Sequence, residues 1–174
     1  MKLNNLRSNI LETIDQEAKK TETNPSKDQK ESGNYKKGHI NLHGLDISIE
    51  NPKGSKRSGT DATGKKWTTT LAHHYGYIKG TKGKDKDHID VFIGPNAEED
   101  LPVFVIDQVN KSGKFDEHKI MMGFKDQQAA RKGYLVSYEE GWTGLGDMTT
   151  MSMDEFKEWL DGDTTKPAHD LKSQ

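Results

Sequence analysis

The stretch that decides the fold of this chain is DKDHIDVFI at residues 85–93, which follows YGYI at residues 75–78. Three carboxylates fall within six positions, and the last of them, Asp90, lies between Ile89 and Val91. An aspartate inside an apolar, β-branched strand is costly to bury unless a cation pairs with it. Acids that lead from a loop into a strand suit Mg²⁺, which prefers oxygen ligands and keeps several waters. The stretch therefore predicts a buried strand that carries a cation-binding carboxylate.

The composition excludes several classes of protein. Of the 174 residues, 30% are hydrophobic and 31% are charged, which favours one domain with extensions over two full domains. The formal net charge of −2 argues against a general nucleic-acid binder, because such proteins usually carry a basic excess. The sequence contains no cysteine, which excludes disulfides and thiolate chemistry. It shows neither the ~20-residue apolar run of a membrane span nor the apolar core of a signal peptide, so we expect a soluble cytoplasmic protein.

Hydrophobic patterning divides the chain into four segments. Apolar residues recur at helical spacing from Leu3 to Ala18, which predicts an amphipathic N-terminal helix over residues 1–18. Residues 19–37 are almost entirely polar, so we expect a flexible linker. A folded domain is expected over residues 38–162, and a disordered tail over residues 163–174. The N-terminal helix is interpreted either as a cap on the domain or as a docking or oligomerisation helix for a protein partner.

Short strands dominate the predicted domain. Residues 45–49 alternate between apolar and polar types, as a half-buried strand does. Further strands are expected over residues 67–71, 75–78, 88–93, 103–106 and 119–124. Asp126 is suited to cap a helix that continues to Tyr134, and Ser152 with Glu155 forms a capping box before another helix. The predicted fold class is α+β, a small OB-like barrel of mixed or antiparallel strands with peripheral helices, preceded by the N-terminal helix and linker.

Three interpretations compete for the acidic loop. A calcium loop of the EF-hand type needs acids or amides at its first, third and fifth positions, followed by glycine. Counted from Asp85, the fifth position is Ile89 and the sixth is Asp90, so the pattern fails. A solvated turn accounts for Asp85 and Asp87 equally well, but it does not explain Asp90. The third interpretation, a magnesium site for a phosphorylated substrate, accounts for all three acids.

Two segments resemble the soluble family I inorganic pyrophosphatases. Residues 85–91 resemble the acidic signature of that family, and HYGYI at residues 74–78 resembles its Asn-Tyr-Gly-aromatic-Ile segment, at the right distance upstream. From about Gly38 to Leu160, the chain more closely resembles the pyrophosphatase-like domain of bacteriophage and mobile-element proteins. The segments that carry this closer resemblance are YGYIKGT (75–81), DVFIGP (90–95), FDEHK (115–119), GW (141–142) and DEFK (154–157).

The resemblance implies a role for each acid of the signature. Asp85 and Asp90 match metal-bridging acids, and Asp87 matches the acid that orients and helps to deprotonate the attacking water. Lys86 and His88 depart from the signature, where the family has a small or polar residue and a proline or acid. Lys86 can point away from the metals, because neighbouring residues of an extended chain face opposite sides. His88 can likewise face solvent or contact one of the aspartates. The implied cofactor is Mg²⁺, with Mn²⁺ as a substitute.

Further matches lie downstream of the acidic loop. The family has another metal acid in an Asp-x-Lys segment, which matches Glu117 before Lys119, with Asp116 as an alternative one residue earlier. Lys119 is then implied to contact a phosphate oxygen. Tyr75 matches a tyrosine that donates its hydroxyl near the phosphates, although a core aromatic is an equally plain interpretation of this residue.

The upstream matches are looser. Glu50 is the best match for the glutamate of the family, and Arg57 or its neighbour Lys56 for a phosphate-binding cation. Lys65 or Lys66 matches the remaining cation. For each lysine, a solvated loop charge is an equally good interpretation.

The late Tyr-Lys pair of the family has no clear counterpart. Tyr134 and Lys132 are the nearest candidates. The histidines do not form a metal motif, because His73 and His74 are adjacent rather than spaced. His118 is expected either to contact a metal-binding acid or to be exposed.

The leading hypothesis is Mg²⁺-dependent hydrolysis of pyrophosphate, or of another small phosphoanhydride, by a metal-activated water. Under the resemblance to phage proteins, such an enzyme works in the host cytoplasm. The alternative is a non-catalytic pyrophosphatase-like component of a phage particle, attached through the N-terminal helix and linker. A single-strand nucleic-acid binder that uses Tyr75, Tyr77, Phe92 and Trp67 is disfavoured by the net charge and by the buried acid.

Overall fold

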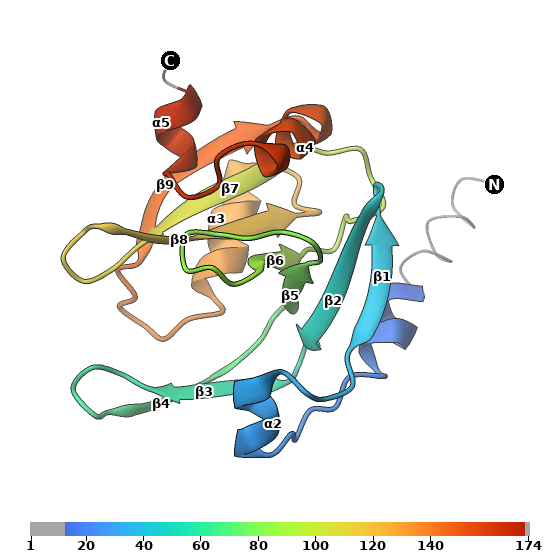
Figure 1. Ribbon diagram of the computed structural model, residues 1–174, viewed down its shortest axis with the longest axis vertical. Helices are drawn as coiled ribbons and strands as arrows, with labels where there is room; N and C mark the ends of the chain where they lie inside the picture. Colours follow the sequence, from blue (N-terminus) through green and yellow to red (C-terminus); the bar gives the residue numbers. More distant parts are fainter. Residues whose placement is uncertain (1–12, 173–174) are drawn as a thin grey trace.

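The structure of the chain, a computed structural model, describes residues 13–172 (Figure 1). Residues 13–18 are helical. The following elements are α2 (Lys27–Ser32), β1 (Gly38–Leu42), β2 (Leu45–Asn51), β3 (Lys56–Thr60), β4 (Lys66–Thr70), β5 (His74–Ile78), β6 (Ile89–Ile93), β7 (Val103–Val109), β8 (Phe115–Met122), α3 (Gln127–Leu135), β9 (Leu145–Met151), α4 (Met153–Asp161) and α5 (Ala168–Lys172). The predicted α+β class is confirmed. In the described part of the chain, no helix is both long and apolar enough to cross a membrane.

Seven strands form one curved sheet in the order β1-β2-β5-β6-β8-β7-β9, and β3 pairs with β4 in a separate hairpin (Figure 1). Neighbouring strands of the large sheet are antiparallel, except for β6 and β8, which are parallel. The order is linear, and within residues 13–172 no ladder between β1 and β9 closes it. This arrangement is compatible with the OB-like barrel, and a closed barrel stays a prediction.

The strands and helices with clear sequence signals are present. The segments expected over 75–78, 88–93 and 103–106 coincide with β5, β6 and the first part of β7. Asp126 caps α3 by accepting a bond from the backbone N–H of Ala129 at 2.8 Å. Ser152 and Glu155 make both bonds of the capping box before α4. Strand β9, in contrast, has no clear alternation in its sequence, LGDMTTM, and was not expected.

Strand alternation divides the interior into two hydrophobic cores. On β6, Ile89, Val91 and Ile93 pack into the first core, which also takes in α4, α5 and the helical residues 13–18. Phe92 points to the opposite face and packs into the second core, beneath α3. Because Asp90 is two residues from Phe92, it shares that second face. The period of two therefore brings the strand aspartate to the α3 side of the sheet.

Gly76 explains the small residue between the two tyrosines of the Tyr-Gly-Tyr segment. A Cβ atom built at this position would lie 1.8 Å from the backbone oxygen of Ser48 on β2. Only glycine therefore allows β2 and β5 to approach this closely. The close pairing fixes the position of Tyr75, which precedes Gly76 on β5.

The segment expected to be a flexible linker, residues 19–37, is attached to the sheet instead. Thr21 is buried, and its Oγ1 atom donates to the carbonyl of Ile49 at 2.7 Å and accepts from the N–H of Gly38 at 2.9 Å. Helix α2 lies within the segment and begins at a capping box formed by Ser26 and Gln29. Hydrogen bonds thus hold a segment that has little apolar surface to bury.

The N-terminal segment is described only from residue 13. Ile14 and Ala18 belong to the first core, which fits the interpretation of this segment as a cap on the domain. The remainder of the expected helix, residues 1–12, lies outside the described residues.

The segment expected to be a disordered tail also contacts the fold. Asp107 on β7 accepts bonds from the backbone N–H groups of Ala168 at 2.9 Å and His169 at 3.1 Å, and so caps α5. Thr164 donates its hydroxyl to the carbonyl of Lys82 at 2.6 Å. Local sequence could not indicate this arrangement, because the capping carboxylate lies 61 residues before the helix that it caps.

We expect Asp107→Ala to lower the free energy of unfolding by about 2–4 kcal/mol, because it leaves buried N–H groups without an acceptor. The buried imidazole of His118, 3.3 Å from Asp107, would also lose its partner. Urea denaturation followed by circular dichroism measures the change. The matched control is Asp116→Ala, which removes an exposed aspartate from β8. Equal destabilisation of the two variants would show that Asp107 has no special structural role.

Candidate active site

Three side chains from neighbouring strands meet in a hydrogen-bonded triangle. Tyr75 on β5 donates its hydroxyl to Asp90 Oδ2 on β6 at 2.6 Å. The Nζ atom of Lys119 on β8 lies 2.7 Å from the Tyr75 hydroxyl and 2.7 Å from Asp90 Oδ2. Asp90 and Lys119 are partners in the parallel register of β6 and β8. The cation that a carboxylate in this strand requires is therefore the ammonium of Lys119.

The surroundings of the triangle keep Lys119 charged. The side chain is fully buried, and burial acts to lower its pKa. The surrounding tyrosine hydroxyls and carboxylates outweigh burial and hold the pKa of Lys119 well above its ordinary value. Burial raises the pKa of Tyr75, so its hydroxyl keeps its proton. The triangle thus contains a permanent positive charge and a neutral phenol.

Glu117 extends the cluster along β8. Its Oε1 atom lies 2.5 Å from Lys119 Nζ and accepts a longer bond, 3.4 Å, from Gln108 Nε2. The pKa of Glu117 is raised, mainly by burial, while Lys119 opposes the rise. Contact with the carboxyl group of Asp85 raises it further. The acidic loop therefore reaches the strand acids through Asp85.

Glu50 and Arg57 complete the charged surroundings. The pKa of Glu50 is raised by burial and by repulsion from Asp90, while nearby cations, Arg57 among them, lower it. The guanidinium carbon of Arg57 lies 4.6 Å from the centre of the Tyr75 ring. Burial acts to lower the pKa of Arg57, but the phenols of Tyr75 and Tyr138 and the carboxylate of Asp90 hold it above its usual value.

The donor chemistry of this cluster fits a hard divalent cation. Four carboxylates, those of Glu50, Asp85, Asp90 and Glu117, surround two buried or half-buried cations. Burial, and after it the neighbouring acids, raises the pKa of Glu50 and of Glu117. Oxygen ligands and an excess of negative charge are what Mg²⁺ binding requires. The arrangement is not a preformed cage, since residues 13–172 contain no group of three or more acids or histidines within reach of one ion. The ammonium of Lys119 lies between two of the acids instead.

The acidic loop itself faces solvent. Asp85 and Asp87 are exposed, and the backbone N–H of Asp87 donates to Asp85 Oδ1 at 3.0 Å. Lys86 is exposed and takes a left-handed backbone conformation with φ of 69°. The ring of His88 stacks on that of Tyr77, with centroids 4.5 Å apart. Lys86 and His88, which depart from the signature, therefore place no positive charge beside the strand carboxylates Asp90 and Glu117.

A comparison with protein families gives a match to this sequence. A family model described as inorganic pyrophosphatase matches residues 27–161. The chain belongs to the inorganic pyrophosphatase family. The matched region of this pyrophosphatase-family chain begins at the first residue of α2 and ends at the last residue of α4. A search of curated proteins finds no match.

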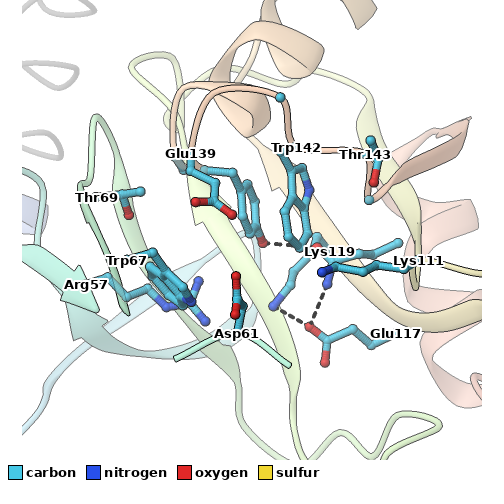
Figure 2. Close-up of a pocket in the computed structure, with 15 residues that line it drawn as sticks. Arg57, Asp61, Trp67, Thr69, Lys111, Glu117, Lys119, Glu139, Trp142 and Thr143 are labelled. Atoms are coloured by element: carbon cyan, nitrogen blue, oxygen red, sulfur yellow. Dashed lines mark hydrogen bonds and ion pairs between the residues drawn. The ribbon is translucent and has the colours of Figure 1, made fainter. Parts of the chain in front are cut away.

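Beside the triangle of this pyrophosphatase-family chain lies a pocket of about 670 Å³, which Lys119 lines (Figure 2). Lys119 and Glu117 form its floor on β8. Its walls come from the β3–β4 hairpin, from the turn between β7 and β8, and from the loop after α3. The lining residues are Arg57, Asp61, Trp67, Thr69, Gln108, Lys111, Glu117, Lys119, Ser137, Tyr138, Glu139, Gly141, Trp142, Thr143 and Gly144.

The aromatic wall of the pocket was not expected from the sequence. Tyr138 stacks on Trp142, with centroids 4.5 Å apart and an angle of 10° between the rings. Tyr138 also hydrogen-bonds Arg57 and so contacts a candidate phosphate-binding side chain. Trp142 was noted only as part of the Gly-Trp segment that carries the resemblance. Its indole Nε1 donates to the hydroxyl of Tyr134 at 2.9 Å.

The structure distinguishes between alternative residues that the sequence offered for the same role. Glu117 faces the triangle, whereas its alternative, Asp116, is exposed and alternates to the other face of β8. Arg57 lines the main pocket and also a smaller cavity of about 190 Å³ beside Glu50, whereas the exposed Lys56 does not line the main pocket. Lys65 and Lys66 are exposed and line neither cavity.

Tyr134 and Lys132 were the candidates for the late Tyr-Lys pair of the family. Neither of them lines the pocket. Tyr134 is buried, and its hydroxyl donates to Gln108 Oε1 at 2.6 Å, so it supports the pocket wall from behind. Lys132 is exposed on α3 and does not line the pocket. Tyr138, four residues after Tyr134, contributes a tyrosine to the lining instead.

The histidines serve the scaffold. His118 lies on the face opposite Lys119, where its ring packs edge-on against Trp159 with centroids 4.7 Å apart. It is buried and contacts Asp107, so the expectation that it contacts a metal-binding acid or is exposed was wrong. His74 accepts the backbone N–H of Lys53 at 2.9 Å, and His73 packs edge-on against Phe124.

We expect Lys119→Met to lower the free energy of unfolding by about 2 kcal/mol at neutral pH, because two partly buried carboxylates lose their shared cation. Without Lys119, which lowers the pKa of Glu117, that pKa rises further above its unfolded value. A carboxyl group whose pKa is raised by folding lowers the stability of the folded protein as the pH rises from the unfolded pKa through the folded pKa. The loss should therefore shrink between about pH 7.5 and pH 4.5, as the carboxylates take up protons.

Urea denaturation at the two pH values measures this dependence. The exposed Lys132→Met serves as the matched control. A loss in Lys119→Met that does not change with pH would show that the cost is one of packing alone.

Proposed function

We propose that this chain hydrolyses a small phosphoanhydride, most simply inorganic pyrophosphate to two phosphates. The observation that carries the proposal is the buried Lys119, whose ammonium lies at the floor of an open pocket together with Arg57. Two fixed cations beside a set of carboxylates can bind a dense anion and offset its charge in the transition state. Membership of the inorganic pyrophosphatase family supports the same substrate.

We assign each side chain a role that its position or its match to the family supports. Lys119 and Arg57 contact phosphate oxygens, the latter with a planar fork suited to two oxygens. Tyr75 keeps its proton and donates it to Asp90 at 2.6 Å, which positions the Asp90 carboxylate beside Lys119. Asp87 is exposed at the loop and free of a described side-chain partner, so it can accept the proton of the attacking water.

Asp85, Asp90 and Glu117 are the residues that would hold Mg²⁺, or Mn²⁺ in its place. A bound divalent ion lowers the pKa of a coordinated water and offsets phosphate charge. Asp90 and Glu117 would then exchange part of their contact with Lys119 for the ion. That exchange leaves the ammonium free to contact a phosphate oxygen.

One observation favours the non-catalytic alternative, a pyrophosphatase-like structural component. The strand acids are already neutralised by Lys119, at 2.7 Å from Asp90 and 2.5 Å from Glu117. A fold that used these residues only as an internal ion pair would have the same geometry. Turnover of pyrophosphate separates the two functions.

With Mg²⁺ present, we expect phosphate release from pyrophosphate and a fall in kcat of at least about 100-fold in Asp87→Asn, because the amide cannot accept the proton. A colorimetric phosphate assay measures the rate. The control is Asp100→Asn, an exposed loop aspartate that lines neither the main pocket nor the cavity beside Glu50. Unchanged turnover in Asp87→Asn would remove the proposed base. Absence of turnover in the unaltered protein would favour the structural alternative.

Chelation of divalent ions should stop phosphate release, and added Mg²⁺ or Mn²⁺ should restore it. Glu117→Gln should raise the Mg²⁺ concentration for half-maximal activity at least about tenfold, since it removes one charged ligand. Asp116→Asn, its exposed neighbour, should leave that concentration unchanged. Activity that survives chelation, or equal effects of the two variants, would contradict the assignment of Glu117 as a ligand.

A further inference from the structure

The main pocket is larger and more aromatic than pyrophosphate needs. Its volume of about 670 Å³ lies within the roughly 300–1,000 Å³ of pockets for small organic ligands. Trp67, Tyr138 and Trp142 line it together with charged residues. A bare phosphoanhydride is an anion that is solvated by cations and hydrogen-bond donors, and the faces of aromatic rings offer it neither. The aromatic wall therefore indicates a ligand with a planar group.

The two indoles are held by glycines, which shows that their positions are fixed by the backbone. A Cβ atom on Gly59 would lie 2.6 Å from the Trp67 ring, across the β3–β4 pair. A Cβ atom on Gly144 would lie 2.4 Å from the Trp142 ring. Both rings are only partly buried, so each keeps accessible surface in the pocket. Figure 2 shows Trp67 on the hairpin side and Trp142 on the opposite, loop side.

The charges of the pocket are arranged for a phosphate chain attached to that planar group. Arg57 and Lys119 lie at the end next to Asp90, where a terminal phosphate would be bound. Lys111, from the turn between β7 and β8, adds a third cation to the lining. Lys111 acts electrostatically on Asp61 of the hairpin, so the two turns approach each other at the pocket.

We infer that the pocket binds a nucleoside di- or triphosphate, with its base stacked on Trp67 and its terminal phosphate at Lys119 and Arg57. Nucleoside polyphosphates combine a planar heteroaromatic ring with a phosphoanhydride, which are the two features that the lining residues match. Carboxylates of Asp61 and Glu139 also line the pocket and can accept bonds from ribose hydroxyls or base amino groups. These acids and the net charge of −2 disfavour a nucleic-acid strand.

This inference rests on the proposed function, because the same residues act on the terminal phosphate. Water oxygen forms a bond to the terminal phosphorus, and the bond from that phosphorus to the bridging oxygen breaks. The electron pair stays on the bridging oxygen, which leaves as part of the shortened nucleotide. One proton of the water passes to Asp87 and then to solvent. A nucleoside diphosphate thus gives the monophosphate and one phosphate.

The test compares ADP with pyrophosphate as substrates of the full chain with Mg²⁺. We expect Trp67→Leu to lower the ratio of kcat/KM for ADP to kcat/KM for pyrophosphate about tenfold, because stacking on an aromatic ring is lost. Trp67→Phe should retain most of the ratio, which separates stacking from a folding defect. Trp159→Phe is the matched control, since this indole packs in the first core, away from the pocket. Its ratio should equal that of the unaltered chain.

Calorimetric titration with ADP distinguishes failure of this inference from failure of the proposed function. Hydrolysis of pyrophosphate without binding or hydrolysis of ADP would overturn the inference and leave the proposed function intact. A ratio that Trp67→Leu does not change would also overturn it. Binding of ADP that weakens about tenfold in Trp67→Leu, with no turnover of either compound, would support the nucleotide pocket and overturn the proposed hydrolysis.

Discussion

The ammonium of Lys119 is the interaction on which the rest of the site depends. It lies where β5, β6 and β8 meet and contacts a phenol and two carboxylates at 2.5–2.7 Å. Without it, the acid within the apolar strand β6 would be an uncompensated charge. The parallel pairing of β6 with β8 places Lys119 level with Asp90. Within residues 13–172, the single parallel ladder of the sheet thus brings the ammonium to the carboxylate that needs it.

Around this cation, the protein gathers more negative charge than it neutralises. Burial, and to a smaller extent that crowding, raises the pKa values of Glu50 and Glu117. The scaffold that maintains the crowding lies on the other side of the same strands, where Asp107 and His118 are buried among apolar side chains. Consecutive residues on β7 and β8 therefore serve two separate tasks, stability on one face and chemistry on the other.

The sequence predicts the centre of the site better than its walls. Asp90 was recognisable because a carboxylate between Ile89 and Val91 conflicts with its surroundings, and the Glu117–Lys119 pair followed from the resemblance to the family. Tyr138 gave no such signal, and Trp67 was considered only for the disfavoured single-strand binder. The roles of both depend on where the hairpin and the loop after α3 fold back over the sheet. The attachment of residues 163–172 was equally hidden, because its capping carboxylate belongs to β7.

The β3–β4 hairpin has a mechanical consequence for the pocket. In the described part of the chain it shares no ladder with the seven-stranded sheet, and Figure 1 shows it projecting from the body of the molecule. Its base is fixed by Leu71 in the second core, while Arg57 reaches Tyr75 and Tyr138 across the gap. An outward movement of the hairpin would break these side-chain contacts but no hydrogen bonds of the seven-stranded sheet. A ligand can therefore enter the pocket, and a product can leave it, without movement of the central strands.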